Sequence, residues 1–219
     1  MKFPNAAKGV RRIYIAELLM LLAAGLMIVT LIFGAINGVK LGAGEAQIAE
    51  NASVPAAFTA LALASTLLLL VAFIMNLVGV INASKDDQGF KNALWTTLIG
   101  IGLSLATSVF PGTFATGSAA SNWMNLISSI VSLATTFFIL SGIISLAQKL
   151  GDASTRGTAE KAQKMLLITY AVSMVLELLV ILLKNPTLMV IVTILVYVVD
   201  MITYIIYLRA LVKAKSMLA

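Results

Sequence analysis

Apolar residues form six long runs along this chain, separated by short polar segments. A helix of about 20 apolar residues crosses a hydrocarbon core of about 30 Å, and each run reaches roughly that length. The runs therefore predict six membrane-spanning helices, connected as three antiparallel hairpins. The predicted spans are about 13–36, 56–82, 92–110, 123–148, 165–183 and 187–209.

The third and fourth runs need to be separated, because no charged residue lies between Asn92 and Gln148. This stretch is far too long for one crossing. Pro, Gly, Ser, Thr and Asn gather between Pro111 and Asn122, and these residue types favour turns. The chain is therefore expected to fold back there.

The composition agrees with a membrane protein. Hydrophobic residues make up 60 % of the 219 positions and charged residues 11 %, against about 45–50 % and about 25 % in soluble proteins. We therefore expect an all-α integral membrane protein whose residues 1–219 form a single transmembrane domain.

The positive charges predict how the chain is oriented. Of the 15 Lys and Arg residues, only Lys40 and Lys184 fall in segments on one side of the six predicted spans. The other side holds the remainder, and Lys and Arg are enriched in cytoplasmic loops. Both termini should therefore be cytoplasmic, and we expect the protein in a bacterial cell membrane.

The odd-numbered helices start in similar ways, each after a basic stretch. The three starts are Lys8-Gly-Val-Arg-Arg, Gln88-Gly-Phe-Lys-Asn and Glu160-Lys-Ala-Gln-Lys. Aligning them brings Glu17, Thr97 and Thr169 to the same depth. This weak similarity favours three parallel repeats about an axis along the membrane normal.

Polar residues recur at steps of three and four along the last three helices, which keeps them on one helix face. Polar groups inside a bilayer should face protein or water. The faces consist of Asn125, Ser129, Ser132 and Thr136 in the fourth helix, Thr169, Ser173 and Glu177 in the fifth, and Thr193, Tyr197, Asp200, Tyr204 and Tyr207 in the sixth. The stripe on the fourth helix either lines a pore or makes helix contacts.

Glu177 and Asp200 are the most informative polar residues, because a carboxylate at the membrane centre costs about 2.5–3.5 kcal/mol. Antiparallel pairing around the turn at Lys184 places Glu177 beside Thr193 and Tyr197, and Asp200 beside Thr169 and Ser173. Neither acid has a basic residue nearby. Each is either a neutral acid held by hydroxyl groups or a proton or cation site, and both interpretations stay open.

Several classes of function are disfavoured. The chain has no His and no Cys, so it cannot hold a Ser-His dyad, a thiol nucleophile or a His- or Cys-bearing zinc site. We expect neither enzyme activity, nor a cofactor, nor a bound metal. The basic residues are scattered at helix ends without an aromatic-interleaved stripe, so no nucleic-acid partner is expected.

Two functions remain. The first is a transporter or channel for a small solute or cation, or the membrane subunit of one, with the intramembrane acids as proton or cation sites. The second is a non-transporting membrane subunit for assembly, sensing or immunity, whose polar stripes are helix contacts. The expected partners are the lipid bilayer, another membrane protein or a second copy of the chain, and a small solute or cation.

Overall fold

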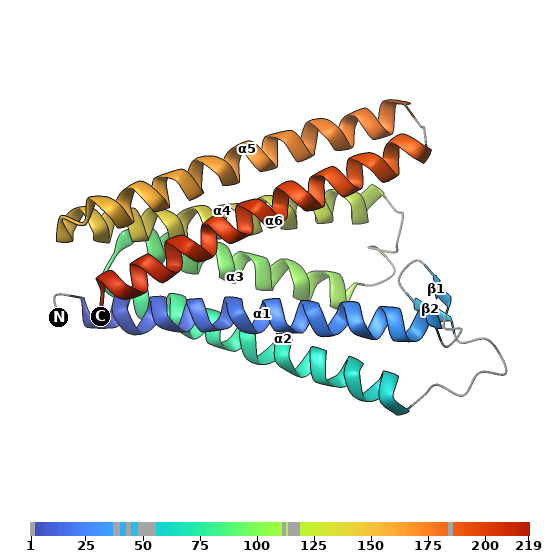
Figure 1. Ribbon diagram of the computed structural model, residues 1–219, viewed down its shortest axis with the longest axis horizontal. Coiled ribbons are helices and arrows are strands. Elements are labelled where there is room, and N and C mark those ends of the chain that lie inside the picture. The colour runs from blue at the N-terminus through green and yellow to red at the C-terminus, as the bar shows by residue number, and fades with distance from the viewer. Residues whose placement is uncertain are drawn as a thin grey trace. The chain divides into compact units, whose positions relative to one another are not determined.

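In the part of the chain that it describes, the computed structural model has six long helices and one short β-hairpin (Figure 1). The strands β1 and β2 pair antiparallel, with Leu41 opposite Ala46. The elements in chain order are α1 (Pro4–Ile36), β1 (Lys40–Gly42), β2 (Glu45–Gln47), α2 (Ala56–Ala83), α3 (Gln88–Val109), α4 (Ala119–Leu150), α5 (Ala153–Leu183) and α6 (Pro186–Met217).

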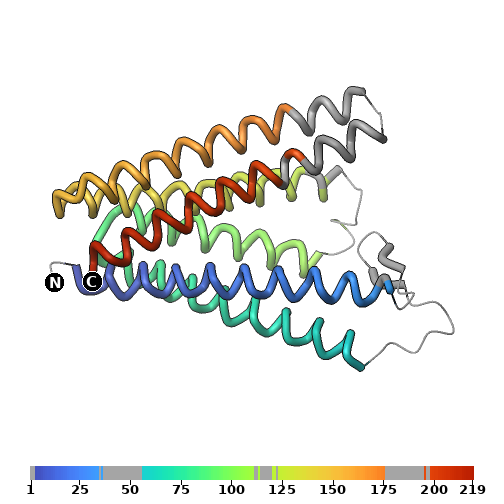
Figure 2. The backbone as a smooth tube through the Cα atoms, viewed as in Figure 1, coloured from blue at the N-terminus to red at the C-terminus, as the bar shows by residue number. Residues whose placement is uncertain are grey.

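The structure describes most of the backbone and a smaller set of side chains (Figure 2). The backbone ranges are 3–36, 40–42, 45–47, 56–110, 113, 119–183 and 186–219. Within them, side chains are not described at positions 35, 40–42, 45–47, 119, 122, 176–194, 196 and 197.

Four helices in the described part of the chain are long and apolar enough to cross a membrane. The candidate spans are Pro4–Gly34, Ala56–Ala83, Gln88–Val109 and Trp123–Leu150. Many large apolar side chains are exposed along the helices, for example Leu67 at 62 % and Met201 at 66 %. Such a surface is suited to lipid rather than water. The prediction of a helical, membrane-embedded protein is therefore confirmed.

The helices extend beyond the predicted spans, mostly at one end. α5 begins at Ala153 instead of 165, and α6 ends at Met217 instead of 209. The added turns of α5 are polar and those of α6 contain Lys213 and Lys215, so they are missing from a prediction based on uncharged apolar runs. They are helical because they pack together: Ala159 and Ala162 of α5 are buried, as are Ala210 and Leu211 of α6.

The chain divides into two compact units. Unit 1 comprises residues 1–11 and 77–219, and unit 2 comprises residues 12–76. In unit 1, α4 contacts α3, α5 and α6, and α5 lies along α6. In unit 2, the buried Glu17 of α1 accepts a hydrogen bond from Asn76 of α2 at 3.4 Å.

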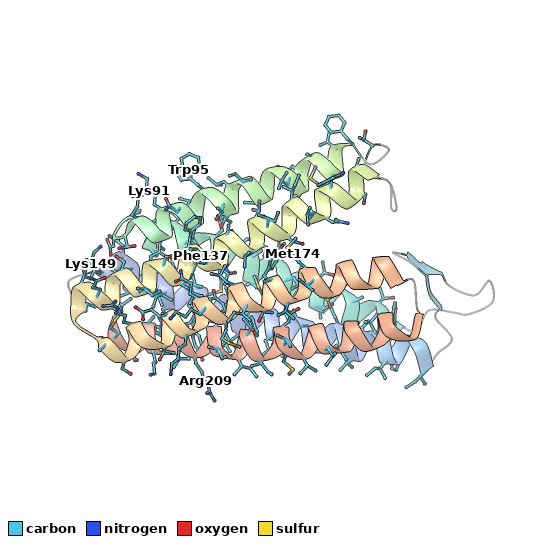
Figure 3. The ribbon with its side chains drawn as sticks, turned by 90° about the horizontal axis from the view of Figure 1, so that it is seen from above. Lys91, Trp95, Phe137, Lys149, Met174 and Arg209 are labelled. Carbon is cyan, nitrogen blue, oxygen red and sulfur yellow. The ribbon has the colours of Figure 1, made fainter. Side chains whose placement is uncertain are left out.

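The core of unit 1 lies at one end, which we call the basic end. Here α3 begins, α4 ends, α5 begins and α6 ends, and Lys91 and Lys149 lie at this end (Figure 3). The fully buried residues Phe90, Leu140, Leu146 and Leu211 all lie in these helix ends. Toward the other end of unit 1, large side chains such as Phe110 and Trp123 are exposed.

Two glycines allow α3 and α4 to approach each other closely at the basic end. A Cβ on Gly89 would lie 2.4 Å from the backbone nitrogen of Gly142, and a Cβ on Gly142 would lie 2.5 Å from the Phe90 ring. No side chain fits at either position without displacing backbone or an aromatic ring. The crossing of α3 and α4 therefore depends on both glycines.

A two-residue turn joins α4 to α5. Gly151 has φ of 74°, a left-handed conformation that favours glycine. Its amide donates to the Gln148 carbonyl at 3.2 Å, and the Asp152 amide donates to the Ala147 carbonyl at 2.9 Å. This is the hydrogen-bond pattern of a Schellman cap, which ends α4 and forces α5 to reverse direction immediately.

Candidate functional site

The contact between α5 and α6 contains a hydrogen bond between two buried hydroxyl groups. The Oγ1 atoms of Thr169 and Thr203 are 2.6 Å apart, and the residues are 4 % and 5 % exposed. Either hydroxyl can be the donor. This bond lies near the middle of both helices and joins Thr169 to Thr203 across their antiparallel contact.

Asp200 lies about one turn from Thr203, further from the basic end. Ser173 lies one turn from Thr169 in the same direction, so the two residues are at nearly equal depth, because each residue of helix rises about 1.5 Å. Ser173 is half-buried and Asp200 is exposed. None of the described residues forms a hydrogen bond or ion pair with the Asp200 carboxylate. The hydroxyl of Thr169 is bonded to Thr203 instead.

Tyrosines follow Asp200 on α6. The rings of Tyr204 and Tyr207 have centroids 6.3 Å apart and planes inclined at 46°. Tyr204 is half-buried and Tyr207 is 5 % exposed. The side chains of Glu177, Thr193 and Tyr197, which the sequence pattern places on the same stripes, lie outside the described residues.

The polar stripe of α4 points partly outward. Asn125, Ser129 and Ser132 are exposed, and Thr136 is half-buried. The Thr136 hydroxyl donates to the Ser132 carbonyl at 3.3 Å, within its own helix. One polar contact of α4 with α3 comes from a residue outside the predicted stripe: the Thr135 hydroxyl lies 2.9 Å from that of Thr96.

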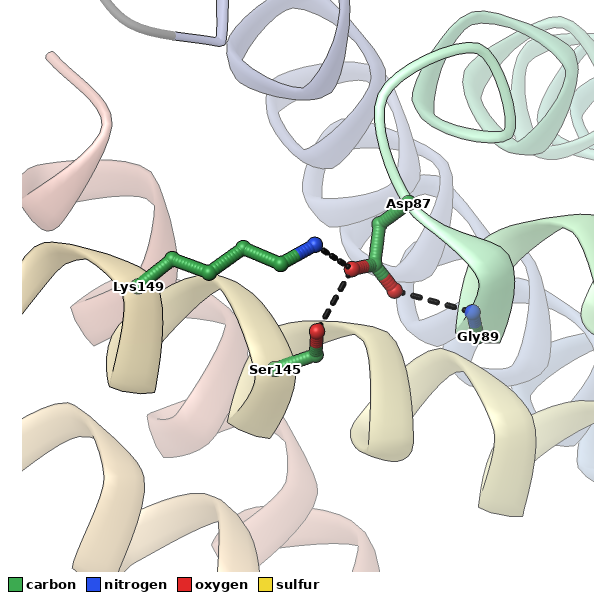
Figure 4. A network of polar contacts seen from close by, with 4 residues as sticks. All are labelled: Asp87, Gly89, Ser145 and Lys149. Atoms are coloured by element: carbon green, nitrogen blue, oxygen red, sulfur yellow. Dashed lines mark hydrogen bonds and ion pairs between the residues drawn. The ribbon is translucent and has the colours of Figure 1, made fainter.

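A second polar cluster, centred on Asp87, lies at the basic end and was missed by the sequence analysis. One carboxylate oxygen accepts from the Gly89 amide at 2.8 Å, which caps the start of α3. The other accepts from Ser145 Oγ at 2.6 Å and from Lys149 Nζ at 2.7 Å (Figure 4). An Asp placed just before a helix is a recognised capping signal, but its contacts with α4 have no signature in the sequence.

The neighbouring Asp86 binds the start of α1 within unit 1. Its carboxylate accepts from the Ala6 amide at 2.7 Å and from Asn5 Nδ2 at 3.0 Å. Free amides at a helix start need such acceptors. The two adjacent acids therefore satisfy the first turns of two different helices.

The α5 side of the basic end is held by similar bonds. Asp152 accepts from the Thr155 hydroxyl at 2.6 Å and from the Thr155 amide at 3.0 Å. These hydrogen bonds, the hydroxyl bond foremost, hold the pKa of the Asp152 carboxyl below its usual value of 3.8. Lys213 of α6 donates to Ser154 and Thr158, both at 2.9 Å.

The described side chains include no group of three Asp or Glu residues able to hold a metal ion. Comparisons with protein families, with curated proteins and with solved structures give no match for this chain. Fold and composition together define the class: a helical integral membrane protein.

Proposed function

We propose that this chain is the membrane subunit of a transport assembly for a cation or a small polar solute, with Asp200 as a proton or cation site. The supporting observation is that Asp200 is exposed in the long apolar helix α6 and receives no hydrogen bond from the described residues. A lipid-facing carboxylate would cost about 2.5–3.5 kcal/mol. A water-filled path, closed on its far side by a partner or a second copy, removes this cost.

The chemistry of the stripes favours a cation or polar solute over an anion. Around Asp200 they supply hydroxyl groups from Ser173 and Tyr204, and by sequence pattern also from Thr193 and Tyr197. Glu177 adds a second carboxylate on α5, whereas no Lys or Arg occurs between Lys164 and Lys184 or between Lys184 and Arg209. Oxygen ligands and negative charge suit a proton or metal cation.

We further propose how the helices are arranged in the membrane. All six helices cross the bilayer as three hairpins, and both termini lie in the cytoplasm of a bacterial cell. The basic end of unit 1 is then the cytoplasmic end. The distribution of Lys and Arg supports this orientation.

Reconstitution into liposomes tests the transport role. Wild-type protein should move protons, or a cation from a screened set, across the membrane above the leak of empty liposomes. Asp200→Asn should reduce this flux to background, because an amide neither titrates near neutral pH nor carries a full negative charge. Folding should be preserved, since the substitution removes a charge and keeps the shape.

A matched control separates a local effect from a general effect of charge. Glu160→Gln removes one carboxylate from the same chain, at a position where Glu160 pairs, among the described residues, with Arg156 one turn away on α5. This variant should keep wild-type flux. Equal flux in the wild type and in Asp200→Asn would refute the role of Asp200, and wild-type flux no higher than that of empty liposomes would refute transport by this chain alone.

The exposed stripe of α4 favours a second candidate, a non-transporting subunit that binds another membrane protein through α4. Asn125, Ser129 and Ser132 are exposed, and interhelical hydrogen bonds from such residues stabilise helix association. If α4 binds a partner through these residues, replacing all three by Leu should release the partner or dissociate a homo-oligomer. Particle mass in detergent, measured by light scattering, would reveal the loss, with Ser104→Leu on α3 as a control for an exposed hydroxyl.

A further inference from the structure

A groove lies between α5 and α6 at the basic end of unit 1. Its volume is about 450 Å³, within the range of ordinary ligand sites. Three of its six lining residues are basic. The lining consists of Thr158, Lys161, Lys164 and Met165 of α5 and Ile206 and Arg209 of α6.

The positive charge of this groove is largely unbalanced. Lys161, Lys164 and Arg209 are exposed, and none forms an ion pair with the described residues. The nearest carboxylate along α5, that of Glu160, is engaged by Arg156 at 2.7 Å. Lys213 adds another positive charge at the rim, where it donates to Thr158.

The apolar stems of the basic residues form part of the groove wall, and the surroundings of the groove change from basic to apolar along the helix axes. Met165 and Ile206 lie on the side away from the basic end, and the same helix faces continue with the exposed residues Ile168 and Ile202. In Figure 3, Arg209 projects outward from α6. A ligand that complements this gradient has an anionic head and an apolar tail.

We propose that this groove binds the phosphate headgroup of an anionic phospholipid, with the acyl chains lying along the apolar faces of α5 and α6. Basic pockets between membrane helices on the cytoplasmic side suit such headgroups. The inference rests on the proposed placement of the basic end at the cytoplasmic membrane boundary. It does not depend on transport through Asp200.

Lipid binding to the purified full-length protein in a neutral detergent tests this assignment. The probes are phosphatidylglycerol, phosphatidylcholine and glycerol 3-phosphate, and the readout is the lipid-dependent rise of the thermal midpoint together with bound lipid counted by native mass spectrometry. Phosphatidylglycerol should bind and stabilise wild-type protein. Phosphatidylcholine, which has no net charge, and the tailless glycerol 3-phosphate should do so far less.

Two charge-matched variants locate the site. Lys161→Gln/Lys164→Gln/Arg209→Gln should weaken phosphatidylglycerol binding about 100-fold, from the usual contribution of a basic residue near an anionic membrane surface. Arg11→Gln/Lys85→Gln/Lys91→Gln removes the same charge from exposed positions of unit 1 outside the groove and should bind like the wild type. Should the groove triple variant fold poorly, the single change Arg209→Gln against Arg11→Gln makes the same comparison.

Equal losses in the two variants would overturn the proposal, because they would indicate diffuse attraction to charge. Equally tight binding of glycerol 3-phosphate would overturn the lipid assignment in favour of a soluble phosphate ester. Asp200→Asn should bind phosphatidylglycerol like the wild type. Lipid binding and transport are therefore measured independently, and failure of one proposal can be distinguished from failure of the other.

Discussion

Asp87 and Lys149 form an ion pair of 2.7 Å in which the two partners are buried very unequally. The Asp87 side chain is 2 % exposed, whereas that of Lys149 is 47 % exposed. The Asp87 carboxylate is therefore solvated by protein groups, whereas the Lys149 ammonium group is also accessible to water. The two partners should therefore respond differently to removal.

Lys149→Met should destabilise the protein more than Asp87→Asn. The first change leaves a buried carboxylate without its counter-ion, at a cost of about 1–3 kcal/mol. The second keeps an N-cap, because Asn caps helices well and should cost below about 1 kcal/mol, and it leaves Lys149 free to meet water. Thermal midpoints in detergent measure both effects. In the double variant, the loss caused by Lys149→Met should be partly recovered, and additive losses would contradict this account.

Gly89→Ala should destabilise the contact between α3 and α4. The new methyl group would lie 2.4 Å from the Gly142 nitrogen, and overpacking of this kind costs about 1–3 kcal/mol. Gly102→Ala is the control on the same helix, because nothing lies within 4 Å of a Cβ there. It should leave the thermal midpoint unchanged or raise it. A Gly89→Ala protein as stable as Gly102→Ala would show that the crossing is looser than described.

Gly151→Ala should weaken the turn between α4 and α5. An Ala residue in the left-handed conformation costs about 1–2 kcal/mol, and Gly151→Asn should recover part of the loss, since Asn tolerates this conformation. Gly157→Ala, in the open first part of α5, should be neutral or stabilising. The unfolding midpoints of the three variants are the measurement, and identical midpoints would contradict the prediction.

Acid should weaken the start of α5 through Asp152. Because the pKa of its carboxyl is lowered in the folded protein, its contribution is fully present above the unfolded value of about 3.8 and is lost as pH falls through the lowered value. Asp152→Asn should therefore be less stable than the wild type at neutral pH, and the difference should shrink toward pH 2. A difference independent of pH would mean that the charge of Asp152 is irrelevant.

Single cysteines test the orientation without interference, because the chain contains no Cys. An impermeant thiol reagent applied to intact cells should label Gly44→Cys and Gly117→Cys, and it should not label Ser84→Cys or Ser154→Cys, which lie on the Lys- and Arg-rich side. Permeabilised cells supply the control, in which Ser84→Cys and Ser154→Cys must react with the reagent. The reverse pattern would invert the proposed topology.

The sequence predicted the helices well where apolar content alone decides them. The prediction for α2, 56–82, matches Ala56–Ala83. It was short by several turns where helices continue past the apolar run, as in α5 and α6, because polar helical turns such as 153–164 are stabilised by packing that hydropathy does not register.

Periodicity predicted only some of the contacts that the polar stripes make. Spacing placed Thr169 toward α6, where it is buried, but it did not indicate Thr203 as its partner. Which residue pairs with a hydroxyl depends on how each helix is rotated about its own axis as well as on depth in the membrane. Steps of three and four residues determine that rotation only to within tens of degrees. The Asp87 cluster was missed for a different reason: Ser145 and Lys149 lie 58 and 62 positions from Asp87 along the chain, and their four-residue spacing on α4 does not indicate which acid they bind.

The hydrogen bond from the Ala6 amide to Asp86 joins residues 80 positions apart. During synthesis at about 5–20 residues per second, Asp86 is therefore made about 4–16 s after the Ala6 amide whose hydrogen bond it accepts. Until the ribosome has passed the connection between α2 and α3, where Asp86 lies, the first turn of α1 has to rely on water or lipid headgroups. The hydrogen bonding at the start of α1 is thus completed only by a residue translated after the whole of α2.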